Sequence, residues 1–148
     1  MRRAGITGPF GPVCLVEREG LLVGLEWHLP QVPEVSAVLD EGLAQLDAYF
    51  DGRLRRFDLP LDWGTGLNEA VRRAMAQIPQ GETRTYGEIA KQVGAAPQAV
   101  GQACGANPLP ILIPCHRVTG TDWFGGFSAP GGVETKAALL RHEGALLI

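Results

Sequence analysis

The pair Cys115-His116 is the part of this sequence whose residue types are best suited to nucleophilic chemistry. A cysteine attacks as the thiolate, and a neighbouring base or cation lowers the thiol pKa from about 8.5. On an extended strand adjacent side chains point to opposite faces, so the two groups would meet only after a sharp turn at Pro114 or through a water. A buried structural cysteine is the more common role of such a pair, and both interpretations stay open.

Three further polar residues have types that would assist a reactive Cys115. Glu143 would orient His116, as a carboxylate orients the histidine of a catalytic triad. Tyr86 would present a phenol to a pocket, and Asn107 would fix the backbone leading to the nucleophile. Each also has a structural interpretation: a solvated helix end for Glu143, core packing for Tyr86 and a helix cap for Asn107.

The other cysteines do not indicate a metal site. Cys14 and Cys104 are expected to be small apolar packing residues, and the paired Cys and His spacings typical of zinc sites do not occur. We therefore predict neither a metal nor a cofactor. Three cysteines cannot all pair, and an odd number is typical of a reducing compartment, so the expected location is the cytoplasm.

Hydrophobic patterns in the amino-terminal third predict two strands and a helix. Apolar runs at residues 13–16 and 21–27 are separated by a short polar segment, which indicates a hairpin. Apolar residues at helical spacing predict a helix over residues 34–50. Residues 53–63 are expected to be irregular or a short edge strand, because Pro60 cannot donate to a ladder.

The rest of the chain is predicted to be mainly helical. Helical spacing indicates helices at residues 67–78 and 133–142. A Thr-x-x-Glu capping box at Thr85 opens a short helix that stops at Gly94, and a second helix runs from Pro97 to about residue 105. Two short helices joined by a tight glycine-containing turn suggest a helix-turn-helix.

The second of these short helices lies in a segment without charge. No Lys, Arg, Asp or Glu occurs between residues 92 and 116, and the helix is rich in alanine and glycine. Such a helix is either packed in the interior or built to approach another molecule closely. The pattern alone favours neither.

Length and composition set the class of protein. The 148 residues are 45% hydrophobic and 20% charged, which excludes a disordered chain and fits one domain or two small lobes. A net charge of −3 argues mildly against DNA binding, since nucleic-acid binders are usually basic. No apolar run approaches the ~18 residues of a membrane span, so no membrane association is expected.

The segment around Cys115 resembles the active-site signature of the O6-alkylguanine-DNA alkyltransferases. Residues 111–118 read Ile-Leu-Ile-Pro-Cys-His-Arg-Val and follow an Asn-Pro pair, a combination highly specific to that family. The resemblance covers residues 64–144 well and the preceding part loosely. Its other matching motifs are Ile78-Pro79-x-Gly81, Thr85-Tyr86-Gly87-Glu88-Ile89-Ala90, Lys136 and Leu139-Leu140-x-x-Glu143-Gly144.

The resemblance implies an α/β fold with two lobes. Residues 1–63 would form a small ribonuclease-H-like lobe. Residues 64–148 would form a mainly helical catalytic lobe, whose helix-turn-helix enters the minor groove of double-stranded DNA containing O6-alkylguanine. The alkylated guanine would be flipped out of the stack into a pocket. We expect a monomer.

The resemblance also implies roles for individual residues. Cys115 would attack the alkyl carbon as a thiolate, while His116, acting through water and oriented by Glu143, takes the thiol proton. Tyr86 would donate a proton to the departing guanine, and Asn107 would hold the turn that carries the nucleophile. The thioether is not hydrolysed, so each molecule would react once, without a cofactor. Substrate and DNA contacts would come from Gln98, Ala99, Gly101, Arg117, Val118 and Ser128.

Three positions depart from the family pattern. Members generally have an arginine in the recognition helix, which fills the gap left by the flipped base, where this chain has Gln98. Gln98 lacks the charge and planar fork of arginine. Arg72 stands where the family usually has a tryptophan, and the loop at residues 128–132 is two residues longer than the common form.

Two other functions stay open on the sequence. One is a non-catalytic protein that binds alkyl lesions, but relatives of that kind replace the nucleophile, so the presence of Cys115 favours the enzyme. The other is a cysteine alkyl acceptor that acts on free alkylated bases or small molecules. The acidic net charge and Gln98 are compatible with this second alternative.

Overall fold

The computed structural model describes residues 1–121 and 124–146. The chain divides into two compact units, Met1–Asp62 and Trp63–Ile148, and the boundary expected from the sequence lies one residue later. Both helices and strands are present, so the fold is mixed α/β. Within the described residues, no helix has the length and apolar character needed to cross a membrane.

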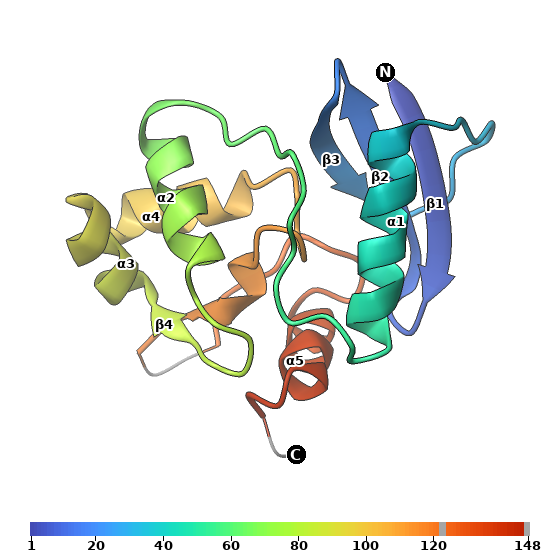
Figure 1. Cartoon of the computed structure of the whole chain (residues 1–148). Coiled ribbons are helices and arrows are strands. Elements are labelled where there is room, and N and C mark those ends of the chain that lie inside the picture. The colour runs from blue at the N-terminus through green and yellow to red at the C-terminus, as the bar shows by residue number, and fades with distance from the viewer. Residues whose placement is uncertain (122–123, 147–148) are drawn as a thin grey trace. The chain divides into compact units, whose positions relative to one another are not determined.

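The amino-terminal unit contains a three-stranded antiparallel sheet in the order β1-β2-β3 (Figure 1). The strands are β1 (Arg2–Gly8), β2 (Gly11–Arg18) and β3 (Leu21–Glu26). The hairpin of β2 and β3 is the predicted one. Strand β1 was not predicted, because its apolar residues are interrupted by arginine and glycine and give no clear alternation.

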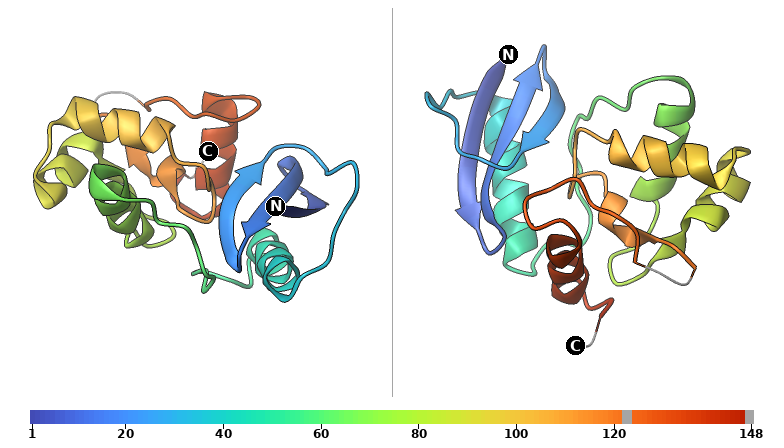
Figure 2. Two further views of the ribbon diagram at one scale, coloured as in Figure 1. Left: turned by 90° about the horizontal axis from the view of Figure 1, so that it is seen from above. Right: turned by 180° about the vertical axis from the view of Figure 1, so that it is seen from behind.

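Helix α1 (Ala37–Phe50) lies across one face of this sheet (Figures 1 and 2). It begins three residues later than predicted because Ser36 is the N-cap, with its hydroxyl accepting from the Leu39 amide at 3.1 Å. The approach is close: a Cβ on Gly42 would lie 2.6 Å from Leu15. The core of the unit consists of Val13, Leu15, Leu22, Leu39, Leu46 and Tyr49.

Residues 53–62 of this unit are irregular, as expected from Pro60. They are linked to the sheet by a parallel bridge between Leu61 and Leu22 and by an ion pair between Asp62 and Arg18 at 3.8 Å. The Leu22 amide donates to the Pro60 carbonyl at 2.8 Å, and the Leu22 carbonyl accepts from the Asp62 amide at 2.9 Å.

Three helices of the second unit pack against one another: α2 (Gly66–Ala76), α3 (Tyr86–Val93) and α4 (Pro97–Gly105). The predicted capping box of α3 is present, since the Thr85 side chain accepts from the Glu88 amide and the Glu88 side chain accepts from the Thr85 amide. Gly94 ends α3 with a left-handed φ of 73°, which turns the chain into α4.

The uncharged helix α4 has one packed side and one exposed side. Val100 and Ala103 are buried, whereas Gln98 and Gln102 are exposed. The sequence left open whether this helix is internal or approaches another molecule. Its packed side explains the apolar positions, and its other side presents small and neutral residues to the surface.

Two very short elements connect α3 with the segment after Cys115. Strand β4 (Arg84–Thr85) pairs in parallel with β5 (Val118–Thr119). Because α3 starts directly after β4, and β5 follows the 3₁₀ helix η1 (Cys115–Arg117), this pairing brings Tyr86 close to the Cys115 segment. The last helix, α5 (Val133–His142), has the predicted bounds and packs against η1.

Candidate active site

Cys115 lies in a sharp turn and not on an extended strand. It is the first residue of η1, and its amide donates to the Ile113 carbonyl at 2.8 Å. The preceding apolar run also turns, because the Leu112 amide donates to the Pro110 carbonyl at 2.9 Å. Ile111, between them, has φ of +72°, a strained value for a β-branched residue. The sharp turn that Cys115 and His116 would need after Pro114 in order to meet is therefore present.

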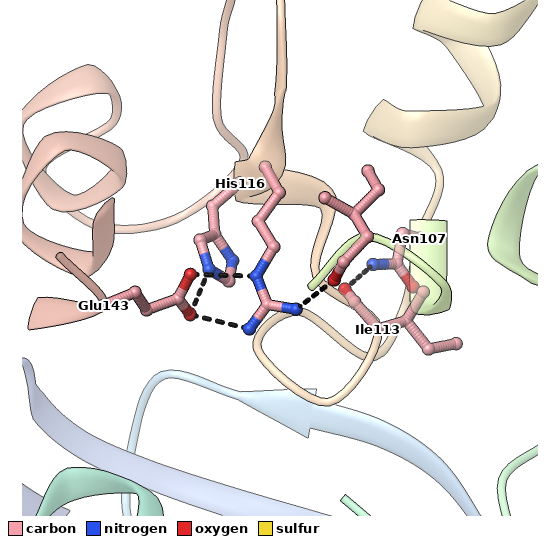
Figure 3. A network of polar contacts seen from close by, with 6 residues as sticks. Asn107, Ile113, His116 and Glu143 are labelled. Atoms are coloured by element: carbon pink, nitrogen blue, oxygen red, sulfur yellow. Dashed lines mark hydrogen bonds and ion pairs between the residues drawn. The ribbon is translucent and has the colours of Figure 1, made fainter. Parts of the chain in front are cut away.

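Asn107 holds this strained segment at both ends. Its Nδ2 donates to the Ile113 carbonyl at 2.9 Å (Figure 3), and its Oδ1 accepts from the Leu109 amide at 3.1 Å. Both bonds are buried, so their loss would leave backbone groups unsatisfied. A hydrogen bond from Asn107 to Cys115 also lowers the pKa of the thiol, against the larger raising effect of burial.

His116, Glu143 and Arg117 form a buried network, of which Figure 3 labels His116 and Glu143. His116 Nε2 lies 2.7 Å from Glu143 Oε2. Arg117 binds the same carboxylate in a bidentate manner, with Nε 2.8 Å from Oε1 and Nη2 2.9 Å from Oε2. A third guanidinium nitrogen donates to the Ile78 carbonyl at 2.7 Å. The network ties η1 to the end of α5 and to the end of α2.

The protonation states within the network follow from burial and hydrogen bonding. Burial raises the pKa of Glu143, but the hydrogen bonds from His116 and Arg117 outweigh it and bring that pKa to about 2. Burial lowers the pKa of His116, although Glu143 opposes this effect. At neutral pH, Glu143 is therefore ionised and His116 is a neutral imidazole.

The tautomer of His116 leaves one nitrogen available as a base. Nε2 carries the proton, because it donates to the ionised Glu143. Nδ1 then has a free lone pair, and it has no hydrogen-bond partner among the described residues although it is buried. An unpaired buried nitrogen is costly, so its retention points to a proton acceptor.

Arg117 and Val118 are placed differently from the sequence expectation. Both were expected to contact the substrate or DNA, with backbone groups near Val118 lining the base pocket, but Arg117 is 6% exposed and Val118 is fully buried. The guanidinium is occupied by Glu143, and the Val118 carbonyl accepts from Lys136 at 2.6 Å. Their role in this conformation is to support the site.

A cavity of about 760 Å³ opens in front of Cys115. Of the residues expected at the site, Tyr86, Gln98, Gly101, Asn107, Cys115 and Ser128 line it, whereas His116, Glu143 and Ala99 do not. None of the described lining residues carries a charge. Besides the six named above, the cavity is lined by Gly87, Pro97, Gln102, Cys104, Gly105, Pro110, Gly120, Thr121, Gly126 and Phe127.

Tyr86 presents a protonated phenol to this cavity. Burial raises its pKa, and negative charge on Cys104 or Cys115 would raise it further, so the phenol is a hydrogen donor at neutral pH. Its hydroxyl packs against Gly125, where a Cβ would lie 2.5 Å from the oxygen. Gly125 also has φ of +82°, so a side chain there is disfavoured both by this backbone conformation and by the contact with the Tyr86 hydroxyl.

Two residues near the cavity were given no catalytic or substrate-binding role from the sequence, where Cys104 was expected to be a small packing residue. Cys104 lines the cavity, with its Sγ 3.6 Å from Met75 Sδ. Lys136 is fully buried beside the site. The sequence does hold a signal for Lys136, because it shares the i, i+3, i+4 face of α5 with Leu139 and Leu140, where an apolar residue is expected.

No metal centre accompanies these groups. Over residues 1–121 and 124–146, no three His, Cys, Asp or Glu side chains are grouped so as to hold an ion. The chemistry available at the site is that of a cysteine, a neutral imidazole held by a carboxylate, and a phenol.

Comparisons with known proteins agree on one family. The model of the 6-O-methylguanine DNA methyltransferase DNA-binding domain matches residues 66–145. A methylated-DNA–protein-cysteine methyltransferase of Mycolicibacterium paratuberculosis is 49% identical, over 93% of this chain and 89% of that protein. One of Mycobacterium tuberculosis is 42% identical with the same coverage. The crystal structure of M. tuberculosis OGT in complex with DNA superposes with a TM-score of 0.86 at 38% identity, covering 98% and 94% of the two chains.

Proposed function

Because the chain belongs to the 6-O-methylguanine DNA methyltransferase family, we propose that it repairs DNA by accepting the alkyl group of O6-alkylguanine on Cys115 Sγ. The observation that carries the proposal is the His116–Glu143 contact of 2.7 Å next to a cysteine that lines an uncharged cavity. A neutral base fits such a cavity, and a cysteine with a held histidine beside it is an activated nucleophile.

His116 removes the proton from the Cys115 thiol through a water molecule bound at Nδ1. Glu143 accepts from Nε2 and so keeps the lone pair on Nδ1 directed away from itself. As the proton arrives, the imidazolium is stabilised by the ionised Glu143, whose second oxygen is held by Arg117. General-base assistance of this kind contributes ~10²–10⁴-fold.

The transfer itself is a displacement at the alkyl carbon. The Cys115 sulfur forms the new S–C bond while the C–O6 bond breaks. The electron pair of the C–O6 bond passes to O6 of the guanine. Tyr86 donates its phenolic proton to the guanine, so the leaving group departs neutral. The product is a thioether, which no group of the site can hydrolyse, and each molecule therefore acts once.

We further propose that α3 and α4 form a helix-turn-helix that enters the minor groove, and that the first unit is a ribonuclease-H-like lobe. Supporting the first point, α4 presents a neutral surface with small residues such as Ala99 and Gly101, and Gln98 stands at the cavity wall. The flipped guanine would pass Gln98 to reach Ser128 and Cys115. The odd number of cysteines supports a cytoplasmic location.

Electrostatics of the second unit predict a weak dependence of DNA binding on salt. Residues 63–148 include seven Lys or Arg, and three of these, Arg72, Arg117 and Lys136, are buried. Few cations remain to contact phosphates, and each such contact contributes about −0.9 to the slope of log K against log salt. We expect a shallow slope for plain duplex DNA.

Gln98→Arg should tighten duplex binding and steepen that slope by up to about 0.9, because it adds one cation to α4. Fluorescence anisotropy over a salt series measures both. Gln31→Arg, which adds the same charge to an exposed position of the first unit, is the matched control. Equal effects of the two substitutions would contradict the use of α4 as the DNA-facing helix.

An uncharged cavity would also admit a free alkylated base, which gives a second candidate function. To separate the two, equal amounts of O6-methylguanine are offered as a duplex oligonucleotide and as the free base, and the guanine formed is quantified. The proposal expects one guanine per protein molecule from the duplex, at a far higher rate than from the base. Comparable rates would favour the small-molecule acceptor.

A further inference from the structure

Lys136 is a buried cation of the second unit with an unusual set of partners. It is fully buried, and its Nζ donates to the carbonyls of Val118 at 2.6 Å and Gly126 at 3.2 Å. Val118 follows η1 directly, and Gly126 precedes Phe127 and Ser128 in the cavity wall. One ammonium group therefore ties the segment after the nucleophile to the part of the cavity wall formed by residues 126–128.

Among the described residues, no carboxylate balances the charge of Lys136. In the described part of the chain, no Asp or Glu oxygen lies within ion-pair distance of Nζ, whereas the buried Arg117 is fully paired with Glu143. Burying an ammonium group without a counter-ion costs several kcal/mol. A buried charge with this energetic cost is expected to form a favourable interaction in some other state of the protein.

Two aromatic rings lie beside Nζ, and the Cys115 and Cys104 thiols are the ionisable groups that act on its charge. The rings of Tyr86 and Phe124 lie with their centroids 5.9 and 5.5 Å from Nζ. Burial lowers the pKa of Lys136 to about 8, and negative charge on Cys115, and then on Cys104, acts to raise it. Reciprocally, Lys136 lowers the pKa of Cys115 against the raising effect of burial.

The other charged groups near Cys115 cancel one another. His116 is neutral at rest, and Glu143 and Arg117 form an ion pair, so this network adds no net charge. Tyr86 and Cys104 are neutral in their protonated forms. Lys136 is thus the one uncompensated cation that acts on the thiol among the described residues.

We propose that Lys136 is a positioning residue for alkyl transfer, which supplies the counter-charge to the Cys115 thiolate and holds the Gly126–Ser128 wall of the cavity against Val118. This inference rests on the proposed function of Cys115 as the alkyl acceptor. The cation has carbonyl partners while Cys115 is a thiol, and it gains an anionic partner when His116 removes the proton. The thiolate is then stabilised before the substrate carbon is attacked.

The test measures the reaction of Cys115 with iodoacetamide against pH, in a Cys104→Ala background, and needs no DNA. Lys136→Met removes the charge but keeps most of the length of the side chain, and Lys136→Arg keeps the charge. We expect Lys136→Met to move the midpoint of the pH profile upward by about one unit, so that the rate near neutral pH falls about tenfold. At high pH its rate should approach that of the parent. Lys136→Arg should restore most of the lost rate at neutral pH.

A purely structural role predicts a different result: both substitutions would lower the rate at every pH without moving the midpoint. That outcome, or an unchanged profile in Lys136→Met, would overturn the proposal. Exposed Lys91→Met is the control for loss of a lysine charge elsewhere.

A second measurement avoids any substitution of Lys136. The chain has two lysines, so ¹³Cε labelling gives two signals, and the exposed Lys91 supplies the reference. Because the coupling is reciprocal, Cys115→Ser should lower the pKa of Lys136 by the amount that Lys136 lowers that of Cys115. An unaltered Lys136 titration would contradict the proposal. If both measurements give the expected results but the protein takes no methyl group from DNA, the proposed function is wrong while the electrostatic role of Lys136 stands.

Discussion

Cys115→Ala abolishes alkyl transfer in this account while leaving binding to O6-methylguanine duplexes largely intact. The substitution removes the nucleophile and no other group that lines the cavity. Alanine is smaller than cysteine, so the base can still enter. The measurement pairs nucleoside analysis of the DNA, which should show O6-methylguanine unchanged, with a gel shift on the same duplex.

Cys14→Ala is the matched control, since Cys14 is buried in the first unit and is not among the residues that line the cavity. It should transfer the alkyl group as the parent does. Transfer by Cys115→Ala to another residue of the protein would contradict the mechanism. Loss of both transfer and lesion binding would mean that Cys115 shapes the cavity more than this account allows.

Glu143→Gln is expected to reduce both stability and transfer rate strongly. A glutamine of the same size removes the charge that pairs with Arg117 and leaves a buried guanidinium uncompensated, which costs about 3–5 kcal/mol. It also removes the anion that stabilises protonated His116, so the rate of transfer should fall ~10²-fold or more. Urea denaturation and single-turnover transfer measure the two effects. Glu134→Gln, on the exposed face of α5, should change neither.

The ionisation of Glu143 should also affect how the free energy of unfolding depends on pH in the acid range. The pKa of Glu143 is about 2 in the folded protein and near 4.5 when unfolded, so its stabilising effect is complete above about pH 4.5. As pH falls from 4.5 towards 2, the unfolded state binds a proton first and this stabilisation is lost. The stability difference between the parent and Glu143→Gln should therefore shrink over that window. A constant difference would show that Glu143 is not ionised in the folded state.

Elements with local signals were predicted well from the sequence. Helix α5 has the predicted bounds, and the capping box at Thr85 opens α3 as expected, because periodicity and caps are written in neighbouring residues. Strand β1 and the β4–β5 pair were not predicted. A two-residue parallel pair has no periodicity of its own, and it forms only because the segments at Arg84 and Val118 meet in the fold.

The same distinction applies to the site. Cys115, His116 and Glu143 were recognised from residue types and from a specific motif, and the structure places His116 and Glu143 in contact. The inward position of Arg117 depends on the carbonyl of Ile78, which is 39 residues away, and no local pattern reports it. Lys136 did break an apolar face of α5, but its partners at Val118 and Gly126 are visible only after folding.

The most direct test of the central claim is the mass of the protein after reaction with a duplex that contains O6-methylguanine. Trypsin should release residues 92–117 as one peptide, because no Lys or Arg lies between Lys91 and Arg117, and fragmentation separates Cys104 from Cys115 within it. We expect this peptide to gain one methylene mass, localised to Cys115, while the DNA regains plain guanine. A methyl group on Cys104, or repaired DNA with an unmodified Cys115, would contradict it.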